Sequence, residues 1–336
     1  MHKIDFVIPW VDGSDINWIN EKNKYDLNSI NGSNNDARYR DWDNLKYWFR
    51  GVDKYAPWVN RVFFVTWGHV PAWLDTQHEK LKIVNHSDYI PEEYLPTFNS
   101  NVIELNYHRI PDLSEHFVLF NDDTFLIDHV RETDFFSDGK PCDEFIMSPI
   151  MPNYNVPIIG HTCLNNMLII NKHFDKRSVI KSMYKKVYST KYRKKLFRNI
   201  ALTPWPKLTG FFNDHIPISH LKSTFELMWE KEEEQMKSTC RNKFRTYMDI
   251  NHWLMRYWNL CAGDFVPRKE GFGKMFTVTD DNTAITRYIA SRKGKMICVN
   301  DSIADFDLER AIKEINEAFE SIFPERSSFE LDGGIL

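Results

Sequence analysis

Short hydrophobic runs alternate with a helical pattern through the first half of the chain, and polar residues follow each run directly. Apolar runs of this length are typical of strands that are covered on both faces. They span residues 4–11, 62–66, 81–84 and 116–120. Between the first two runs, apolar residues from Leu45 to Tyr55 recur at helical spacing. The order strand, helix, strand favours an α/β fold with a mostly parallel sheet.

The rest of the chain predicts further helices and then a return to strands. A helix over residues 100–107, capped by Asn99 or Ser100, precedes the fourth run. Helical patterns also cover residues 221–237, 249–260 and 308–323, and strand patterns cover 275–278 and 295–299. We therefore divide the chain into three parts: an α/β half at 1–150, a helical insertion at 151–270 and a C-terminal segment at 271–336.

Composition narrows the class of protein. Of the 336 residues, 42% are hydrophobic and 27% are charged, which is ordinary for a globular chain of one large or two modest domains. The five cysteines are scattered without a CxxC spacing, which argues against a zinc site or a disulfide framework. Reduced thiols suit the cytoplasm. Because we find neither a signal peptide nor an apolar run long enough to cross a bilayer, we expect a cytoplasmic protein.

Residues 172–198 are rich in lysine and arginine and contain a single acidic residue, Asp175. Aromatic and aliphatic residues are interleaved with these cations, which predicts basic amphipathic helices. Such helices suit contact with an anionic membrane surface, and a plain solvated helical face is the alternative. The net charge of −4 at pH 7 says little about partners, and we expect no nucleic-acid partner.

Polar residues stand where three of the predicted strands end. Asp122 and Asp123 come directly after the fourth run, Asp12 follows the first, and His86 follows the third. Ligands of open α/β sheets bind at the carboxyl ends of strands. A carboxylate pair there is costly without a cation or hydrogen-bond donors. The pair therefore indicates a divalent-metal site that neutralises a diphosphate, with an Asp-rich turn as the alternative.

Four separated blocks resemble the Stealth family of sugar-phosphate transferases in order and spacing. The first is IDFVIPWVDGSD at residues 4–15. The second runs from Arg38 and DWDNL through LPTFNS at 95–100 to FNDD at 120–123. The third begins with DHIP at 214–217 and continues to Arg245 and Asp249. The fourth contains CVND at 298–301 and FPERSSFE at 323–330.

The resemblance implies a fold and a reaction. Family members resemble nucleotide-sugar glycosyltransferases of the GT-A, Rossmann-like type, but they transfer sugar-1-phosphate. The family includes bacterial capsule and exopolysaccharide enzymes and the eukaryotic N-acetylglucosamine-1-phosphotransferase. An acceptor sugar hydroxyl would attack the β-phosphorus of a nucleotide sugar, expected to be a UDP-sugar, and a phosphodiester would form. The acceptor would be an oligosaccharide or a lipid-linked sugar, and the insertion would supply acceptor-side and catalytic residues.

The resemblance also implies roles for individual residues. Asp122 and Asp123, completed by Asp301, would hold Mg²⁺ or Mn²⁺, which prefer oxygen ligands. Catalysis would use Asp123, Arg245 as a bidentate phosphate clamp, and His215 as general base, with His86 as the rival base. Substrate-binding residues are expected at Asp12, Arg38, His86, Asn99, Ser100 and Asp249. For Asn99 and Ser100, helix capping is an equally good interpretation.

Two other functions remain open. A metal-dependent glycosyltransferase that releases a nucleoside diphosphate would show much the same motifs on an Asp-rich strand end. A lectin-like assembly module would suit the high aromatic content of 15%. A binding module would not need Asp122, Asp123 and His215 for turnover, so their substitution separates the enzymes from the module.

Overall fold

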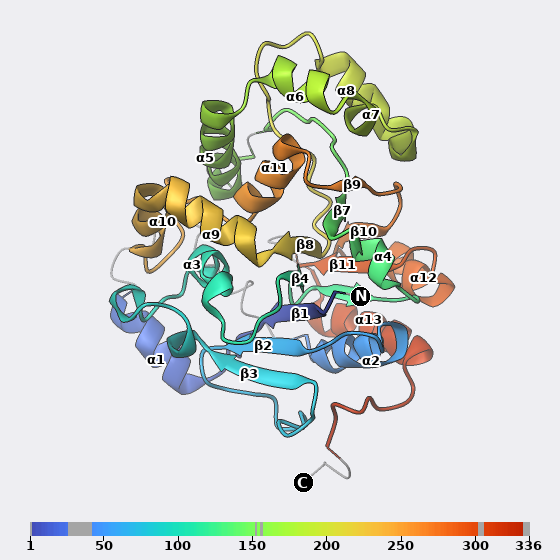
Figure 1. Cartoon of the computed structure of the whole chain (residues 1–336). Coiled ribbons are helices and arrows are strands. Elements are labelled where there is room, and N and C mark those ends of the chain that lie inside the picture. The colour runs from blue at the N-terminus through green and yellow to red at the C-terminus, as the bar shows by residue number, and fades with distance from the viewer. Residues whose placement is uncertain (1, 26–41, 152, 155–156, 302–305, 332–336) are drawn as a thin grey trace.

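The computed structural model describes residues 2–25, 42–151, 153–154, 157–301 and 306–331 (Figure 1). The predicted substrate-binding residue Arg38 lies outside these residues.

A five-stranded sheet forms the centre of the fold (Figure 1). In spatial order its strands are β3 (Leu81–Asn85), β2 (Val62–Thr66), β1 (Ile4–Pro9), β4 (His116–Leu119) and β8 (Ile218–Leu221). The first four are parallel to their neighbours, and β8 pairs antiparallel with β4. The predicted α/β class with a mostly parallel sheet is therefore confirmed.

Alternate residues of the strands contribute to two hydrophobic cores, one on each face of the sheet. Val7 and Phe63 belong to the core that includes α3 (Ser100–Leu105), α9 (Lys222–Lys231) and α11 (Trp253–Ala262). Phe6 and Phe64 belong to the core that includes α2 (Leu45–Tyr55) and α13 (Leu308–Ile322). Both faces are covered, which explains why the strands consist of continuous hydrophobic runs.

A second, three-stranded sheet brings the C-terminal part of the chain beside the end of β4. Its strands are β10 (Gly273–Thr277), β11 (Met296–Asn300) and β5 (Thr124–Leu126), in that order. β11 is parallel to β10 and antiparallel to β5, with Cys298 opposite Thr124. Since β5 follows β4 after a short turn, this register sets the end of β11 alongside Asp122 and Asp123. A third sheet contains β6 (Phe136–Ser137), β7 (Lys140–Asp143) and β9 (Val266–Pro267).

Most of the remaining helices lie between β7 and β9 in sequence. They are α5 (Pro157–His173), α6 (Lys176–Ser182), α7 (Tyr184–Val187), the 3₁₀ helix η5 (Thr190–Lys195), α8 (Leu196–Leu202) and α10 (Glu233–Cys240). Figure 1 places α6, α7 and α8 at the end of the molecule opposite the C-terminus. Shorter or peripheral helices are α1 (Ile16–Tyr25), α4 (Glu132–Phe135), α12 (Thr283–Ser291), η2 (His86–Asp88), η3 (Glu92–Tyr94) and η4 (Tyr107–Arg109).

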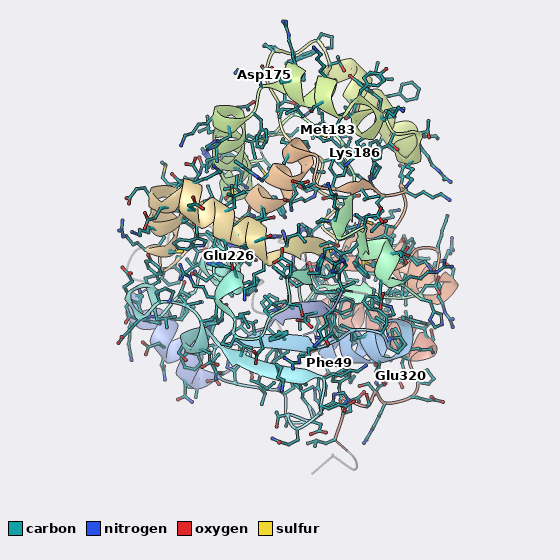
Figure 2. All side chains as sticks on the ribbon, viewed as in Figure 1. Phe49, Asp175, Met183, Lys186, Glu226 and Glu320 are labelled. Atoms are coloured by element: carbon teal, nitrogen blue, oxygen red, sulfur yellow. The ribbon has the colours of Figure 1, made fainter. Side chains whose placement is uncertain are left out.

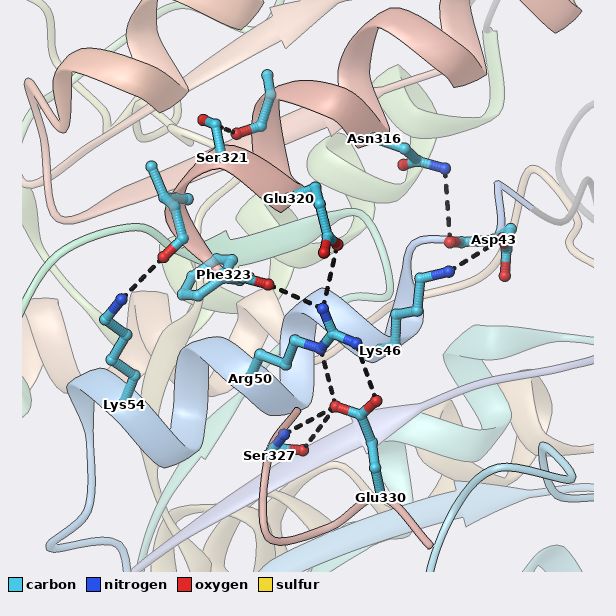
Figure 3. Close-up of polar contacts among 12 residues, drawn as sticks. Asp43, Lys46, Arg50, Lys54, Asn316, Glu320, Ser321, Phe323, Ser327 and Glu330 are labelled. Atoms are coloured by element: carbon cyan, nitrogen blue, oxygen red, sulfur yellow. Dashed lines mark hydrogen bonds and ion pairs between the residues drawn. The ribbon is translucent and has the colours of Figure 1, made fainter. Parts of the chain in front are cut away.

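Arg50 ties the C-terminal segment to α2 (Figure 3). Its guanidinium donates to both carboxylate oxygens of Glu330, at 2.8 and 3.0 Å. It also donates to Glu320 at 3.1 Å and to the backbone oxygen of Phe323 at 2.8 Å. Arg50 and Glu330 are both largely buried, so this two-pronged contact anchors the segment that follows α13.

The fold tests several predictions about helices, cysteines and membrane spans. The predicted helix over 221–237 is divided at Glu232 into α9 and α10. The five cysteines are free thiols, as expected. Within the described residues, no helix combines the length and apolar character that a membrane span requires. The boundaries near residues 150 and 270 stay a prediction, although β8 from the middle part completes the main sheet.

Candidate active site

The site lies where the order of the strands reverses. The chain runs from β1 to β2 and β3, and then returns to β4 on the other side of β1. In open α/β sheets, ligands bind outside the carboxyl ends of the two strands at such a point. Asp12 follows β1 and Asp122 follows β4, so both predicted residues lie at this edge.

The turn that carries Asp122 and Asp123 is held by its neighbours. Thr124 Oγ1 donates to the backbone oxygen of Asn121 at 2.7 Å and accepts from the Asn121 amide at 3.0 Å. On the other side, the Val299 amide donates to the backbone oxygen of Asp123 at 2.8 Å. The backbone of the turn is thus fixed by its contacts with β5 and β11.

His215 meets this turn from the loop before β8. Its Nε2 atom lies 3.4 Å from Asp123 Oδ2 and 3.2 Å from Asn121 Nδ2. The backbone of His215 is left-handed, with φ at 48°, a conformation that costs energy for a residue other than glycine. Burial opposes a charge on this imidazole, but the hydrogen bond and charge of Asp123, aided by Glu104, raise the pKa of His215 above its ordinary value.

Asp123 also offers an atom for a cation. Its Oδ1 is buried and has no hydrogen-bond partner in the described part of the chain, which is costly for a carboxylate oxygen. Ligand atoms of Asp123, His215 and Cys298 lie within 4.8 Å of one another. Burial, and then the charge of Asp123, raise the pKa of Cys298 well above its ordinary value, so its thiol donates to Asp123 Oδ2 at 3.3 Å. The free Oδ1 atom of Asp123 suits an oxygen-preferring cation such as Mg²⁺ or Mn²⁺, whereas His215 and Cys298 are side chains that softer metals also accept.

Asp122 has a different environment from Asp123. Protein atoms around its carboxyl group desolvate it, and the neighbouring charge of Asp123 adds to this, so the pKa of Asp122 rises to about 7. The residue still keeps an exposed surface. A bound cation would favour the charged form of this carboxylate. Asp301 follows β11, the strand of the second sheet whose end lies beside the turn that carries Asp122 and Asp123.

A second group of residues faces the site from α3 and the segment after α10. Arg245 donates to Ser100 Oγ, and both lie near Glu104. Burial raises the pKa of Glu104 to about 7, although Arg245, Ser100 and His215 all act in the opposite direction. The sequence assigns Glu104 to a helix and not to the site. The available signal is its spacing, because Glu104 is four residues after Ser100 and so shares its helical face.

Two buried histidines stand behind Glu104. His252 Nε2 lies 3.7 Å from Glu104 Oε2, and His252 Nδ1 lies 3.0 Å from His220 Nε2. Burial lowers the pKa of His220 to about 3 and lowers that of His252 well below its ordinary value. Both rings are therefore neutral at pH 7 and lie at the back of the site.

Asn99 and Asp249 are fully buried and bonded to each other. Asn99 accepts from the Asn101 amide at 3.0 Å, which caps α3, and donates to Asp249 Oδ2 at 2.8 Å. Asp249 also accepts from the Thr246 amide at 3.1 Å. These contacts hold the segment that carries Arg245 against α3. The predicted capping by Asn99 is confirmed, and substrate binding by this pair stays a prediction.

Asp12 and His86 follow β1 and β3, on the side of the site away from β8. The Asp12 amide donates to His69 Nε2 at 2.8 Å, and His69 Nδ1 lies 3.2 Å from Asp15 Oδ2. His86 is buried, and this burial, with a smaller effect of His69, lowers its pKa to about 4. His69 and Asp15 are absent from the predicted set, and the Asp15 position inside the first block was the available signal.

Comparisons with known proteins identify the family. The descriptions "Stealth protein CR1, conserved region 1", "Stealth protein CR2, conserved region 2" and "Stealth protein CR4, conserved region 4" match residues 2–30, 38–143 and 288–335. A galactosyltransferase structure, LgtC with donor and acceptor sugar analogues, covers 93% of this chain and 95% of its own at 10% identity and a TM-score of 0.37. A likeness of that degree carries no argument about fold or chemistry.

Relatives align over almost the whole length. The capsular polysaccharide phosphotransferase WcwK of Streptococcus pneumoniae is 48% identical and covers 98% of both chains. The exopolysaccharide phosphotransferase cps2G of Lactiplantibacillus plantarum is 41% identical, over 97% of this chain and 96% of its own. The receptor polysaccharide phosphotransferase WefC of Streptococcus gordonii is 39% identical, over 98% and 100%. The chain therefore belongs to the Stealth family and is a transferase.

Proposed function

We propose that this transferase moves hexose-1-phosphate or N-acetylhexosamine-1-phosphate from a nucleoside diphosphate sugar to a sugar hydroxyl. The product is a phosphodiester link in a cell-surface polysaccharide. One observation carries the proposal: His215 and the Asp122–Asp123 turn meet at the strand edge where β1 and β4 end. The names of the relatives, all polysaccharide phosphotransferases, support the same reaction class.

In this proposal, acidic residues would hold a cation beside the donor diphosphate. Asp122, Asp123 and Asp301 would hold Mg²⁺ or Mn²⁺, and the buried Oδ1 of Asp123, which has no hydrogen-bond partner among the described residues, supports this assignment. The cation supplies neutralisation of phosphate charge when it is bound. Asp12 and His86, at the end of β1 and after β3, contact the nucleotide part of a donor such as a UDP-sugar.

His215 acts as the general base. The acceptor hydroxyl oxygen forms a bond to the β-phosphorus, and its proton passes to His215 Nε2. The bond between the β-phosphorus and the bridging oxygen breaks, and the nucleoside monophosphate leaves with that oxygen. The carboxylate of Asp123, 3.4 Å away, stabilises the imidazolium that results. His86 is the weaker candidate base, because its pKa of about 4 leaves little driving force for proton transfer.

Arg245 and Glu104 complete the phosphate side. Arg245 stabilises the negative charge of the transferring phosphoryl group, for which its planar guanidinium is suited. Glu104 and Ser100 orient that guanidinium, as the contact between Arg245 and Ser100 supports. Asn99 and Asp249 position the same segment from the interior. We also propose that the enzyme works in the cytoplasm on an oligosaccharide or lipid-linked acceptor.

A labelled donor tests the reaction. A UDP-sugar labelled at the β-phosphate, with an oligosaccharide acceptor and Mg²⁺ or Mn²⁺, should deliver the label to the acceptor while UMP accumulates. Label recovered in UDP would instead make the enzyme a glycosyltransferase. If a panel of UDP-, CDP- and GDP-linked donors gives no turnover at all, the lectin-like alternative is favoured.

A pair of histidine variants tests the base. His215→Ala should lower kcat by about 10²- to 10⁴-fold and change donor affinity much less. His161→Ala is a suitable control, because His161 is an exposed histidine on α5. An unchanged rate in His215→Ala would move the role of base to His86.

A further inference from the structure

Helices α6, α7 and α8 and the loop after them carry many cationic side chains and, after Asp175, no acidic side chain of their own. Lysine and arginine recur through this segment, and no Asp or Glu occurs between Asp175 and Asp214. Figure 1 places the three helices at one end of the molecule, away from the main sheet. A surface of this kind attracts an anionic partner over a distance set by the ionic strength.

Three of the lysines are buried or half-buried, and each donates to oxygens of the protein itself. Lys176 Nζ donates to the backbone oxygens of Leu202 and Trp205, at 2.5 and 2.8 Å. Lys186 Nζ donates to the backbone oxygens of Gly263 and Phe265. Figure 2 shows Lys186 on the side of this helical layer that faces the rest of the protein.

Lys195 is the third, since it bridges Glu144 at 2.9 Å and Asp214 at 2.8 Å. These three cations stabilise the layer from inside. The exposed cations are a different set, namely Arg177, Lys181, Lys185, Lys191, Arg193, Lys194, Arg198 and Lys207.

Large apolar side chains are exposed among these cations. Phe197 and Ile200 on α8 are 72% and 53% exposed, and Trp205, just after the helix, is 53% exposed. Phe197 and Ile200 are three residues apart and so share a helical face. The opposite side of α8 is anchored, because Asn199 is buried and donates to the backbone oxygens of Phe145 and Val187. The helix therefore presents an apolar face outward on a fixed support.

We propose that this docking face, defined as Phe197, Ile200, Trp205 and the exposed cations Lys185 and Lys194, binds the surface of an anionic lipid bilayer. Aromatic and aliphatic side chains framed by lysine and arginine are the composition of interfacial membrane helices. A soluble anionic polymer would attract the same cations, but it would leave three large apolar side chains in water. The apolar residues thus favour the bilayer.

The docking face is connected to the active site through one residue. Lys195 immediately precedes α8, and its partner Asp214 is next to His215. This ion pair therefore links α8, the helix that would contact the bilayer, to the loop that carries His215. Docking on the bilayer would bring a lipid-linked acceptor toward His215, and this part of the inference rests on the proposed function. Binding to the bilayer itself does not depend on the proposed function.

Vesicle sedimentation of the full chain without substrates tests the docking face. We expect binding to vesicles of phosphatidylglycerol and phosphatidylcholine, and at least tenfold weaker binding to pure phosphatidylcholine or at high salt. Phe197→Ser combined with Ile200→Ser should reduce binding about tenfold or more. Lys185→Gln combined with Lys194→Gln should do the same. Ile16→Ser, which removes a side chain 63% exposed on α1, should leave binding unchanged.

Two further measurements keep the outcome clear. Trp205→Ser lies outside the helix and should weaken binding even if the double apolar variant fails to fold, as judged by circular dichroism. Dextran sulfate serves as the soluble polyanion. Wild-type affinity for vesicles in the folded apolar variants, or equal binding of dextran sulfate and vesicles, would overturn the proposal. Because no substrate is present, this result is independent of the reaction that the enzyme catalyses.

Discussion

The Oδ2 atom of Asp123 lies 3.4 Å from the Nε2 atom of His215, although the two residues belong to different parts of the chain. Asp123 follows β4, and His215 precedes β8, the strand that pairs with β4. The pairing of β8 with β4 therefore brings the acid and the imidazole together. Four expectations about the site and the fold follow from contacts of this kind.

Asp123→Asn should lower turnover by about 10²- to 10⁴-fold while the fold remains intact. The amide removes the charge that stabilises protonated His215 and weakens the oxygen site for Mg²⁺ or Mn²⁺. Initial rates with each metal, together with circular dichroism, measure both effects. EDTA should inhibit the wild type, and full activity in EDTA would contradict the metal assignment.

Arg245→Lys should reduce kcat by at least about tenfold, because lysine keeps the charge but loses the planar fork. The contact with Ser100 and the proximity to Glu104 set this guanidinium beside α3, and the proposed reaction uses it to hold phosphate. Arg241→Lys is the matched control, since Arg241 is exposed and only four residues away. Steady-state kinetics of both variants decide the point. Equal turnover in the two would make Arg245 a residue of no special importance to the reaction.

Glu104 should make the metal-free protein less stable as the pH rises. Its folded pKa is raised to about 7 from 4.5, so its contribution to stability is complete below about pH 4.5 and is lost up to about pH 7. Asp122 changes in the same direction. Urea unfolding at several pH values should show a decline that is smaller in Glu104→Gln, by roughly 2 to 3 kcal/mol. Parallel pH profiles for the two proteins would show that the Glu104 carboxyl titrates normally.

Arg50→Met should destabilise the protein by about 3 kcal/mol, because it leaves Glu330 largely buried without its partner. Arg310→Met removes an exposed ion pair with Asp280 and should cost less than about 1 kcal/mol. Urea denaturation measures both changes. Adding Glu330→Met to Arg50→Met should recover part of the loss, because it removes the uncompensated charge. A further large loss would mean that the hydrogen bonds from Ser327 to Glu330 matter more than the ion pair.

The strands of the main sheet could be predicted because both faces are covered, so their hydrophobic runs are continuous. The positions of Asp12 and Asp122 at the ends of strands could be predicted for the same reason, because they directly follow such runs. β8 was not predicted, because its sequence, Ile-Ser-His-Leu, has two polar residues that are buried at the sheet edge. α5 was missed too, since Gly160 and two asparagines interrupt its apolar pattern.

The roles of single charges could not be predicted from the pattern. Lys176, Lys186 and Lys195 look like surface cations in the sequence, but each donates to buried carbonyl or carboxylate oxygens. Glu104 was expected on a helix, and only the fold shows that Arg245 and His215 lie near it. The partners of these charged side chains come from distant segments of the chain, so a local sequence pattern cannot predict them.

The order in which the strands pair has a consequence for synthesis of the protein. β4 can pair with β1 once both strands have been synthesised, with His116 opposite Ile4, but its other edge stays open until His116 can also pair with Leu221. The turn that carries Asp123 receives its support from β11 later still, when Met296 pairs with Leu126. Such distant pairings make folding slow and leave a strand edge exposed meanwhile. On the ribosome, the turn that carries Asp122 and Asp123 is therefore completed only after β11 has emerged.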